Sequence, residues 1–269
     1  MDVYARNNIK VVGAGGAVDG PLIVLAHGFG CDQQLWCLVV DRLKSEFRLL
    51  LIDHVGSGES DPACWDVQKY SSLAGYATDV VEIVRELDLH DVVFVGHSVS
   101  SMIGALAVIA EPSRIAKLVM LTPSPCYIDD GDYRGGFSQS DIDELLESLE
   151  LNYLGWSHAM APVIMGTPDR PELQNELAET FCRNNPAHAR VFARATFLSD
   201  NRDDLARIFV PTLVIECAQD AIAPREVGAF VQERIPDSRL VTLDATGHCP
   251  QVSAPDATAS AIAAFARPT

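Results

Sequence analysis

The sequence has no long apolar run. None of its hydrophobic stretches approaches the ~20 residues that a helix needs to cross a bilayer. Its first residues, 1–6, contain no apolar segment typical of a signal peptide. We therefore expect no membrane span and no secretory leader, and we predict a cytoplasmic location.

Basic residues are scarce as well. Lysine and arginine number 20 against 37 aspartates and glutamates, which gives a formal net charge of −17. A surface of that sign repels phosphate backbones and anionic lipid headgroups. Neither nucleic acid nor a membrane is therefore expected as a partner.

Signatures of a cofactor are also missing. The seven cysteines are odd in number and show no pair spacing typical of a metal site, which favours reduced thiols. The glycine-containing segment 53–60 resembles a phosphate-binding loop, but no P-loop lysine follows it. We interpret this segment as a structural turn and expect no metal and no organic cofactor.

What the sequence does contain is a series of short apolar runs of strand length, with helical patterns between them. Most of these runs are continuous rather than alternating, as is typical of strands that helices cover on both faces. The predicted strands are residues 9–12, 22–26, 48–53, 92–95, 117–121, 212–216 and 239–243. The pattern predicts an α/β fold in which helices wrap a mostly parallel sheet.

One interval between predicted strands is much longer than a crossover needs. It contains patterns for four helices: one capped by Ser140, followed by helices near 153–163, 171–181 and 186–197. We predict a helical lid over residues 123–209. Residues 1–122 and 210–269 then form the core.

The segment Gly96-His97-Ser98-Val99-Ser100 lies between a predicted strand and an apolar helix. A sharp turn there would expose the Ser98 hydroxyl at the helix N-terminus, where backbone N–H groups stabilise negative charge. The usual pattern, G-x-S-x-G, ends in a glycine that permits close helix–strand packing. Ser100 departs from it, although serine is small enough to replace that glycine.

A serine nucleophile needs a base and a group that orients the base. Asp220 follows one late strand and His248 follows the next, so both lie at the same sheet edge as Ser98. The order Ser, Asp, His is the one found on this architecture. The alternative role for Asp220 is that of a turn-forming residue.

Two backbone N–H groups should bind the oxyanion. One belongs to Val99, which follows the nucleophile, and the other to Phe29, in the loop after the strand 22–26. The alternative for that loop is a plain glycine turn.

Together these motifs resemble the α/β-hydrolase superfamily over nearly the whole chain. A narrower resemblance, to the RsbQ-like hydrolases and the plant karrikin and strigolactone receptors, is carried by seven segments. They are residues 27–33, 96–100, 123–127, 135–137, 152–156, 197–200 and 247–250. The resemblance implies a Ser98–His248–Asp220 triad beneath a four-helix lid.

The resemblance also implies a closed apolar pocket beneath that lid. Its expected lining residues are Phe29, Tyr127, Phe137, Trp156, Val163 and Phe197. Plain packing between lid and core is the alternative for these side chains, and it stays open for Tyr127.

Two functions follow from these features. The first is hydrolysis of a small hydrophobic ester or lactone through an acyl-enzyme. The second, which the resemblance implies, is a signalling component or ligand receptor with slow hydrolysis, whose partner is a sensor-domain phosphatase or another signalling protein docked on the lid. Dehalogenases and epoxide hydrolases are disfavoured, because those relatives carry aspartate at the position of Ser98.

Overall fold

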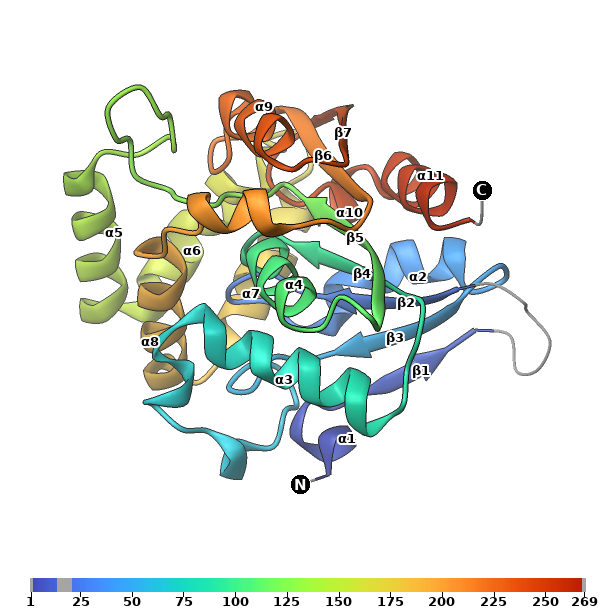
Figure 1. Ribbon diagram of the computed structural model, residues 1–269. Helices are drawn as coiled ribbons and strands as arrows, with labels where there is room; N and C mark the ends of the chain where they lie inside the picture. The colour runs from blue at the N-terminus through green and yellow to red at the C-terminus, as the bar shows by residue number, and fades with distance from the viewer. Residues whose placement is uncertain (1, 14–20, 268–269) are drawn as a thin grey trace.

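The computed structural model describes residues 2–13 and 21–267 and is built on a seven-stranded sheet (Figure 1). The strands follow the spatial order β1-β3-β2-β4-β5-β6-β7, and only β1 runs antiparallel to its neighbour. Their bounds are β1 Lys10–Val12, β2 Leu22–Ala26, β3 Arg48–Ile52, β4 Val92–His97, β5 Ile115–Leu121, β6 Thr212–Gln219 and β7 Ser238–Thr246. The predicted fold class is confirmed, and each predicted strand corresponds to an observed one.

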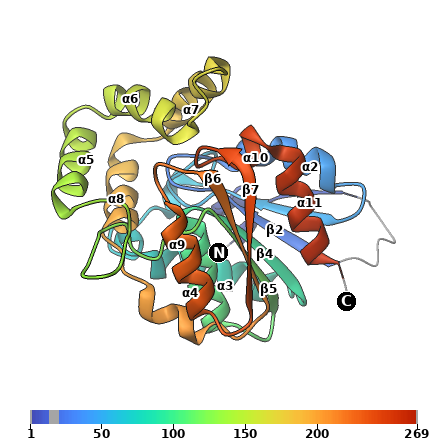
Figure 2. The same ribbon diagram turned by 90° about the horizontal axis from the view of Figure 1, so that it is seen from above.

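Helices cover both faces of this sheet (Figure 2). On one face lie α2 (Cys37–Leu43) and α11 (Pro255–Ala266), and on the other lie α3 (Leu73–Glu86), α4 (Val99–Ala110) and α9 (Arg225–Arg234). Successive side chains of a strand point to opposite faces, and both sets are apolar here, which explains the continuous apolar runs. Two short helices, α1 (Val3–Arg6) and α10 (Pro250–Ser253), complete this part of the chain.

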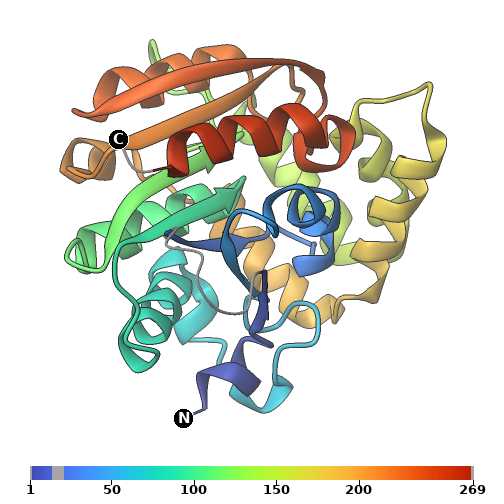
Figure 3. The ribbon, with the colours of Figure 1, turned by 90° about the vertical axis from the view of Figure 1, so that its right-hand side faces the viewer.

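The segment between β5 and β6 carries four helices that lie beyond one end of the sheet (Figures 1 and 3). They are α5 (Gln139–Leu151), α6 (Tyr153–Met165), α7 (Pro171–Arg183) and α8 (Pro186–Phe197). Strand β3 points toward them in Figure 1, so they lie at the carboxyl ends of the parallel strands. Within residues 2–13 and 21–267, no helix is both long and apolar enough to span a bilayer.

The predicted start of α5 was wrong by two residues. Ser138, not Ser140, is the N-cap: its side chain accepts a hydrogen bond from the Asp141 N–H. The Asp141 carboxylate in turn accepts the Ser138 N–H at 2.7 Å, which completes a capping box. Ser140 lies within the first turn of the helix instead.

Candidate active site

Ser98 occupies a strained turn between β4 and α4. Its backbone has φ 56° and ψ −123°, a conformation that L-residues rarely adopt. The turn is tight because Gly96 has no side chain: a Cβ there would lie 2.2 Å from the Ser100 carbonyl oxygen. Gly96 therefore permits the close helix–strand approach, so a serine is tolerated at position 100.

The structure brings Ser98, His248 and Asp220 into one chain of hydrogen bonds. His248 Nε2 lies 2.8 Å from Ser98 Oγ, and His248 Nδ1 lies 2.7 Å from Asp220 Oδ2. A carboxylate accepts only, so Nδ1 carries the proton and Nε2 is free to accept one from the serine. Asp220 directly follows β6 and His248 follows β7, at the sheet edge that the strand order predicts.

Asp220 is held as a carboxylate. Burial alone would raise its pKa, but the electrostatic interaction with His248 and the hydrogen bond to it outweigh that effect. Asp220 Oδ1 also accepts the backbone N–H groups of Ile222 at 2.8 Å and Ala223 at 3.2 Å. These interactions together lower the pKa of Asp220 below its usual value.

Backbone contacts fix His248 from both the core and the helical segment. Its carbonyl oxygen lies 2.8 Å from His97 Nε2, and its N–H donates to the Ile164 carbonyl at the end of α6, also at 2.8 Å. Gly247, with φ 92°, lets the chain pass against α6, because a Cβ there would lie 1.9 Å from the Met165 carbonyl oxygen. His97 is fully buried, and burial lowers its pKa to about 3, with the neighbouring His248 adding to the effect.

This buried histidine predicts a loss of stability in mild acid. The unfolded chain takes up a proton near pH 6.5, and the folded chain does not until about pH 3. Between these two pH values the free energy of unfolding should decrease as the pH is lowered. His97 contributes at most about 1.4 kcal/mol to this decrease for each pH unit. Urea unfolding measures this free energy at pH 7 and at pH 5. The decrease between the two pH values should be about 2 kcal/mol smaller in His97→Gln than in the wild type. Equal drops in both proteins would contradict a buried neutral His97.

Ser98 and His248 line a buried cavity whose other walls are mostly aromatic and aliphatic. Phe29 lines it, with its ring centroid 5.9 Å from that of Trp156 and 5.8 Å from that of Phe197. The Tyr127 hydroxyl lies 3.5 Å from Ser98 Oγ. The free volume is about 30 Å³, enough for one or two water molecules. The space is therefore small and enclosed.

Four of the six predicted pocket residues line this cavity, namely Phe29, Tyr127, Trp156 and Phe197. Val163 does not: it is 47% exposed and faces an open groove beside β6. The cavity-facing stripe of α6 instead continues from Trp156 to Ile164, and Val163 lies on the flank of that stripe. Phe137 is also outside, because it packs partly buried in the turn before α5, where its N–H donates to the Tyr127 carbonyl.

Several lining residues were not predicted. Met160 and Ile164 follow Trp156 at intervals of four along α6, a spacing that could have identified them. The remainder come from separate elements that only the fold brings together. They are Cys31, His97, Leu145, Leu177, Phe181, Thr196, Ile222 and Cys249.

The two residues whose N–H groups are predicted to bind an oxyanion lie near Ser98. Val99 is the first residue of α4, and the Phe29 side chain lines the cavity. Within the described ranges, neither backbone N–H has a hydrogen-bond acceptor. The loop that carries Phe29 runs against the turn, because a Cβ on Gly28 would lie 3.2 Å from Ser98 Cβ.

A strained serine turn, a histidine and a carboxylate at the carboxyl edge of a parallel sheet are typical of α/β hydrolases. A family model described as "Alpha/beta hydrolase family" matches residues 23–261, and the chain belongs to this family. Among the residues that the structure describes, no group of three or more His, Cys, Asp or Glu side chains could hold a metal ion.

Similar proteins identify the subfamily within this family. The chain is 38% identical to a probable esterase of Oryza sativa subsp. japonica, over 94% of this chain and 93% of the rice protein. It is 36% identical to a strigolactone esterase of Arabidopsis thaliana, over 92% of this chain and 91% of the Arabidopsis protein. It is also 36% identical to a karrikin insensitive 2 receptor of Petunia hybrida, over 94% of this chain and 93% of the Petunia protein. The predicted resemblance to the plant receptor subfamily is confirmed, and the chain is an esterase-type hydrolase of that group.

A solved structure agrees with this placement. A hydrolase from Oleispira antarctica superposes with a TM-score of 0.93 at 42% identity, covering 98% of this chain and 96% of the other.

Proposed function

We propose that this protein is a serine hydrolase of small hydrophobic esters or lactones, with Ser98, His248 and Asp220 as its catalytic triad. The observation that carries the proposal is the unbroken chain of hydrogen bonds from Asp220 through His248 to Ser98 in the wall of a mainly apolar cavity. Family membership gives the reaction class, and the geometry supports these residues as its agents.

The steps follow from the positions of the atoms. His248 Nε2 takes the Ser98 proton as Ser98 Oγ attacks the carbonyl carbon, and Asp220 stabilises the imidazolium. The N–H groups of Phe29 and Val99 hold the negative oxygen of the tetrahedral intermediate. The leaving alkoxide takes the proton from His248, and an acyl group stays on Ser98. Water, deprotonated by His248, then attacks this ester and regenerates the serine.

The cavity favours an apolar ligand that still carries oxygen acceptors. Most of its lining is aromatic or aliphatic, but Trp156 Nε1 and Thr196 Oγ1 are buried without a hydrogen-bond partner in the described residues. A buried donor without a partner favours a ligand that accepts from it. An ester or lactone offers such oxygens, whereas a pure hydrocarbon does not.

The proposal also divides the chain into a core, residues 1–122 and 210–269, and a lid, residues 123–209. The core supplies the triad, and α6 and α8 of the lid supply Trp156 and Phe197 to the cavity. A free volume of about 30 Å³ excludes all but the smallest ligands in this arrangement, so the lid must move or repack for substrate entry.

Mass spectrometry of the intact protein tests the proposal. After mixing with p-nitrophenyl acetate and acid quenching, the wild type should carry one acetyl group, and peptide mapping should place it on Ser98. A small lactone such as γ-butyrolactone should give the matching hydroxyacyl adduct. An adduct on a residue other than Ser98 would refute the assignment.

A receptor or signalling role is the second candidate. The observation that favours it is a pair of exposed apolar side chains where α5 ends and α6 begins on the lid: Leu151 is 78% and Leu154 55% exposed. Exposed apolar groups that lie close together are typical of protein docking surfaces. The partner would be a sensor-domain phosphatase or another signalling protein, docked on the lid.

Turnover separates the two candidates. Fast multiple turnover of an ester without any partner favours the enzyme. A single slow turnover that leaves the acyl group on the protein favours the receptor.

We also propose a cytoplasmic location, since Cys31 and Cys249 line the cavity as buried thiols that a reducing compartment protects. Cell fractionation would test that location.

A further inference from the structure

Ser100, the residue that departs from the glycine pattern, contacts the loop after β2. It is fully buried, and its hydroxyl donates to the His27 carbonyl oxygen at 2.5 Å. His54 Nε2 lies 2.6 Å from the same hydroxyl. The single proton of Ser100 must point at the His27 carbonyl, since two oxygen lone pairs would otherwise face each other. His54 Nε2 therefore carries a proton and donates to Ser100.

His27 holds the next peptide of that loop. The His54 backbone N–H donates to His27 Nε2 at 3.1 Å, so the neutral His27 ring carries its proton on Nδ1. Nδ1 lies 2.8 Å from the Gly28 carbonyl oxygen, which also accepts the Cys31 N–H at 3.3 Å. The Gly28 carbonyl and the Phe29 N–H belong to the same planar peptide, so fixing one fixes the direction of the other.

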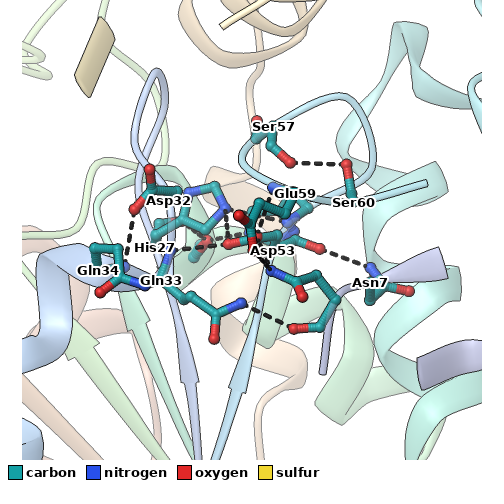
Figure 4. A network of polar contacts seen from close by, with 12 residues as sticks. Asn7, His27, Asp32, Gln33, Gln34, Asp53, Ser57, Glu59 and Ser60 are labelled. Carbon is teal, nitrogen blue, oxygen red and sulfur yellow. Dashed lines mark hydrogen bonds and ion pairs between the residues drawn. The ribbon is translucent and has the colours of Figure 1, made fainter. Parts of the chain in front are cut away.

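The buried carboxylate of Asp53 joins two loops below this arrangement (Figure 4). Asp53 accepts the Gln33 N–H at 2.8 Å and the Glu59 N–H at 2.9 Å, and thereby ties the loop after β2 to the loop after β3. His54, which carries the donor to Ser100, follows Asp53 in that second loop. His27 Nε2 lies 4.0 Å from Asp53 Oδ1. The polar groups around the Phe29 loop are thus joined to one another rather than to solvent.

We propose that Ser100, backed by His54, is a positioning residue for the oxyanion-binding loop. The inference rests on the proposed function, because it assigns Phe29 N–H as an oxyanion donor. Ser100 fixes the His27–Gly28 peptide, and His27 fixes the Gly28–Phe29 peptide, so that the Phe29 N–H is aimed before substrate arrives. A hydrogen bond to the Gly28 carbonyl also polarises that peptide and strengthens its N–H as a donor.

Ser100→Ala and a matched control, Ser101→Ala, test this role. Ser101 is equally buried and lies next in α4, but its hydroxyl donates to the Gly96 carbonyl at 2.9 Å, away from the Phe29 loop. With p-nitrophenyl acetate, Ser100→Ala should lower kcat about 10- to 100-fold, part of the loss that follows removal of a whole oxyanion donor. KM should change less than about twofold, because the ground-state ester makes little use of that donor.

A tetrahedral adduct gives a second readout that a purely structural role would not change. Phenylboronic acid adds to a nucleophilic serine and places a negative oxygen in the oxyanion site. Its inhibition constant should rise in Ser100→Ala by about the factor that kcat falls, and should hold within about twofold in Ser101→Ala. Unchanged kcat and boronate inhibition in Ser100→Ala, or equal losses in Ser101→Ala, would overturn the inference.

If Ser100→Ala does not fold, two variants of His54 test the inference instead. His54→Gln keeps an N–H near the Nε2 position, and His54→Leu removes it. Kcat should fall in the leucine variant and recover most of its value in the glutamine variant, and equal kcat values would overturn the inference. Failure of the proposed function gives a different result, since the wild type would then form no boronate adduct at Ser98.

Discussion

Ser98→Ala should lower kcat for p-nitrophenyl acetate by about 10⁶-fold, the size of loss expected when a triad loses its nucleophile. The reason is that Ser98 Oγ, 2.8 Å from His248 Nε2, is the hydroxyl within the described residues that is hydrogen-bonded to this base. The ester should still bind, since the cavity walls are unchanged. Initial rates measured at high protein concentration check the first claim, and a rise in unfolding temperature with added ester checks the second.

Ser157→Ala is a suitable control for this variant. Ser157 is also fully buried, and its hydroxyl donates to the Tyr153 carbonyl within α6, away from the triad. It should keep its turnover to within about threefold. Hydrolysis by Ser98→Ala at more than about a hundredth of the wild-type rate would mean that another group attacks the ester.

The sequence predicts the core well because its strands are buried on both faces. Helices cover each side of β4 and β5, so both sets of alternating side chains are apolar and the runs stand out. The order and placement of Ser98, Asp220 and His248 likewise follow from strands that end at one edge. These features depend on short stretches of sequence.

The errors arise where a choice depends on the register of one helix or on distant contacts. Val163 and Ile164 are adjacent apolar residues, and only the rotation of α6 puts Ile164 in the cavity. Ser138 and Ser140 are both suitable caps, but Asp141 stands three residues after Ser138 and completes its capping box. The contacts of Ser100 with His27 and His54 join segments far apart in the chain, and no local pattern indicates them.

The volume of the cavity could not be predicted either. This volume depends on how three aromatic rings, those of Phe29, Trp156 and Phe197, pack edge to face. Composition identifies such residues as apolar, but the angles between α6, α8 and the sheet decide whether they leave space. The sequence therefore predicts the hydrogen-bonded arrangement of Ser98, His248 and Asp220 better than the pocket beside it.

Asp220→Asn should lower kcat about 10⁴-fold with the fold intact. The asparagine oxygen can still accept the N–H groups of Ile222 and Ala223, which Asp220 Oδ1 accepts at 2.8 and 3.2 Å. The amide nitrogen then faces His248 Nδ1 and donates to it, which moves the ring proton to Nε2. A protonated Nε2 cannot accept the Ser98 proton, so the base is lost although each side chain stays in place.

Glu216→Gln is the matched control, and the comparison distinguishes orientation of the base from a general need for buried charge. Glu216 is also buried on β6, where its carboxylate contacts Thr242 at 2.7 Å and Arg225 at 3.2 Å, outside the triad. It should change kcat less than about threefold, and similar unfolding midpoints in urea would show that both variants fold. An Asp220→Asn variant that keeps a tenth or more of its activity would mean that His248 does not depend on this carboxylate, and the oxyanion donors would then have to supply most of the rate enhancement.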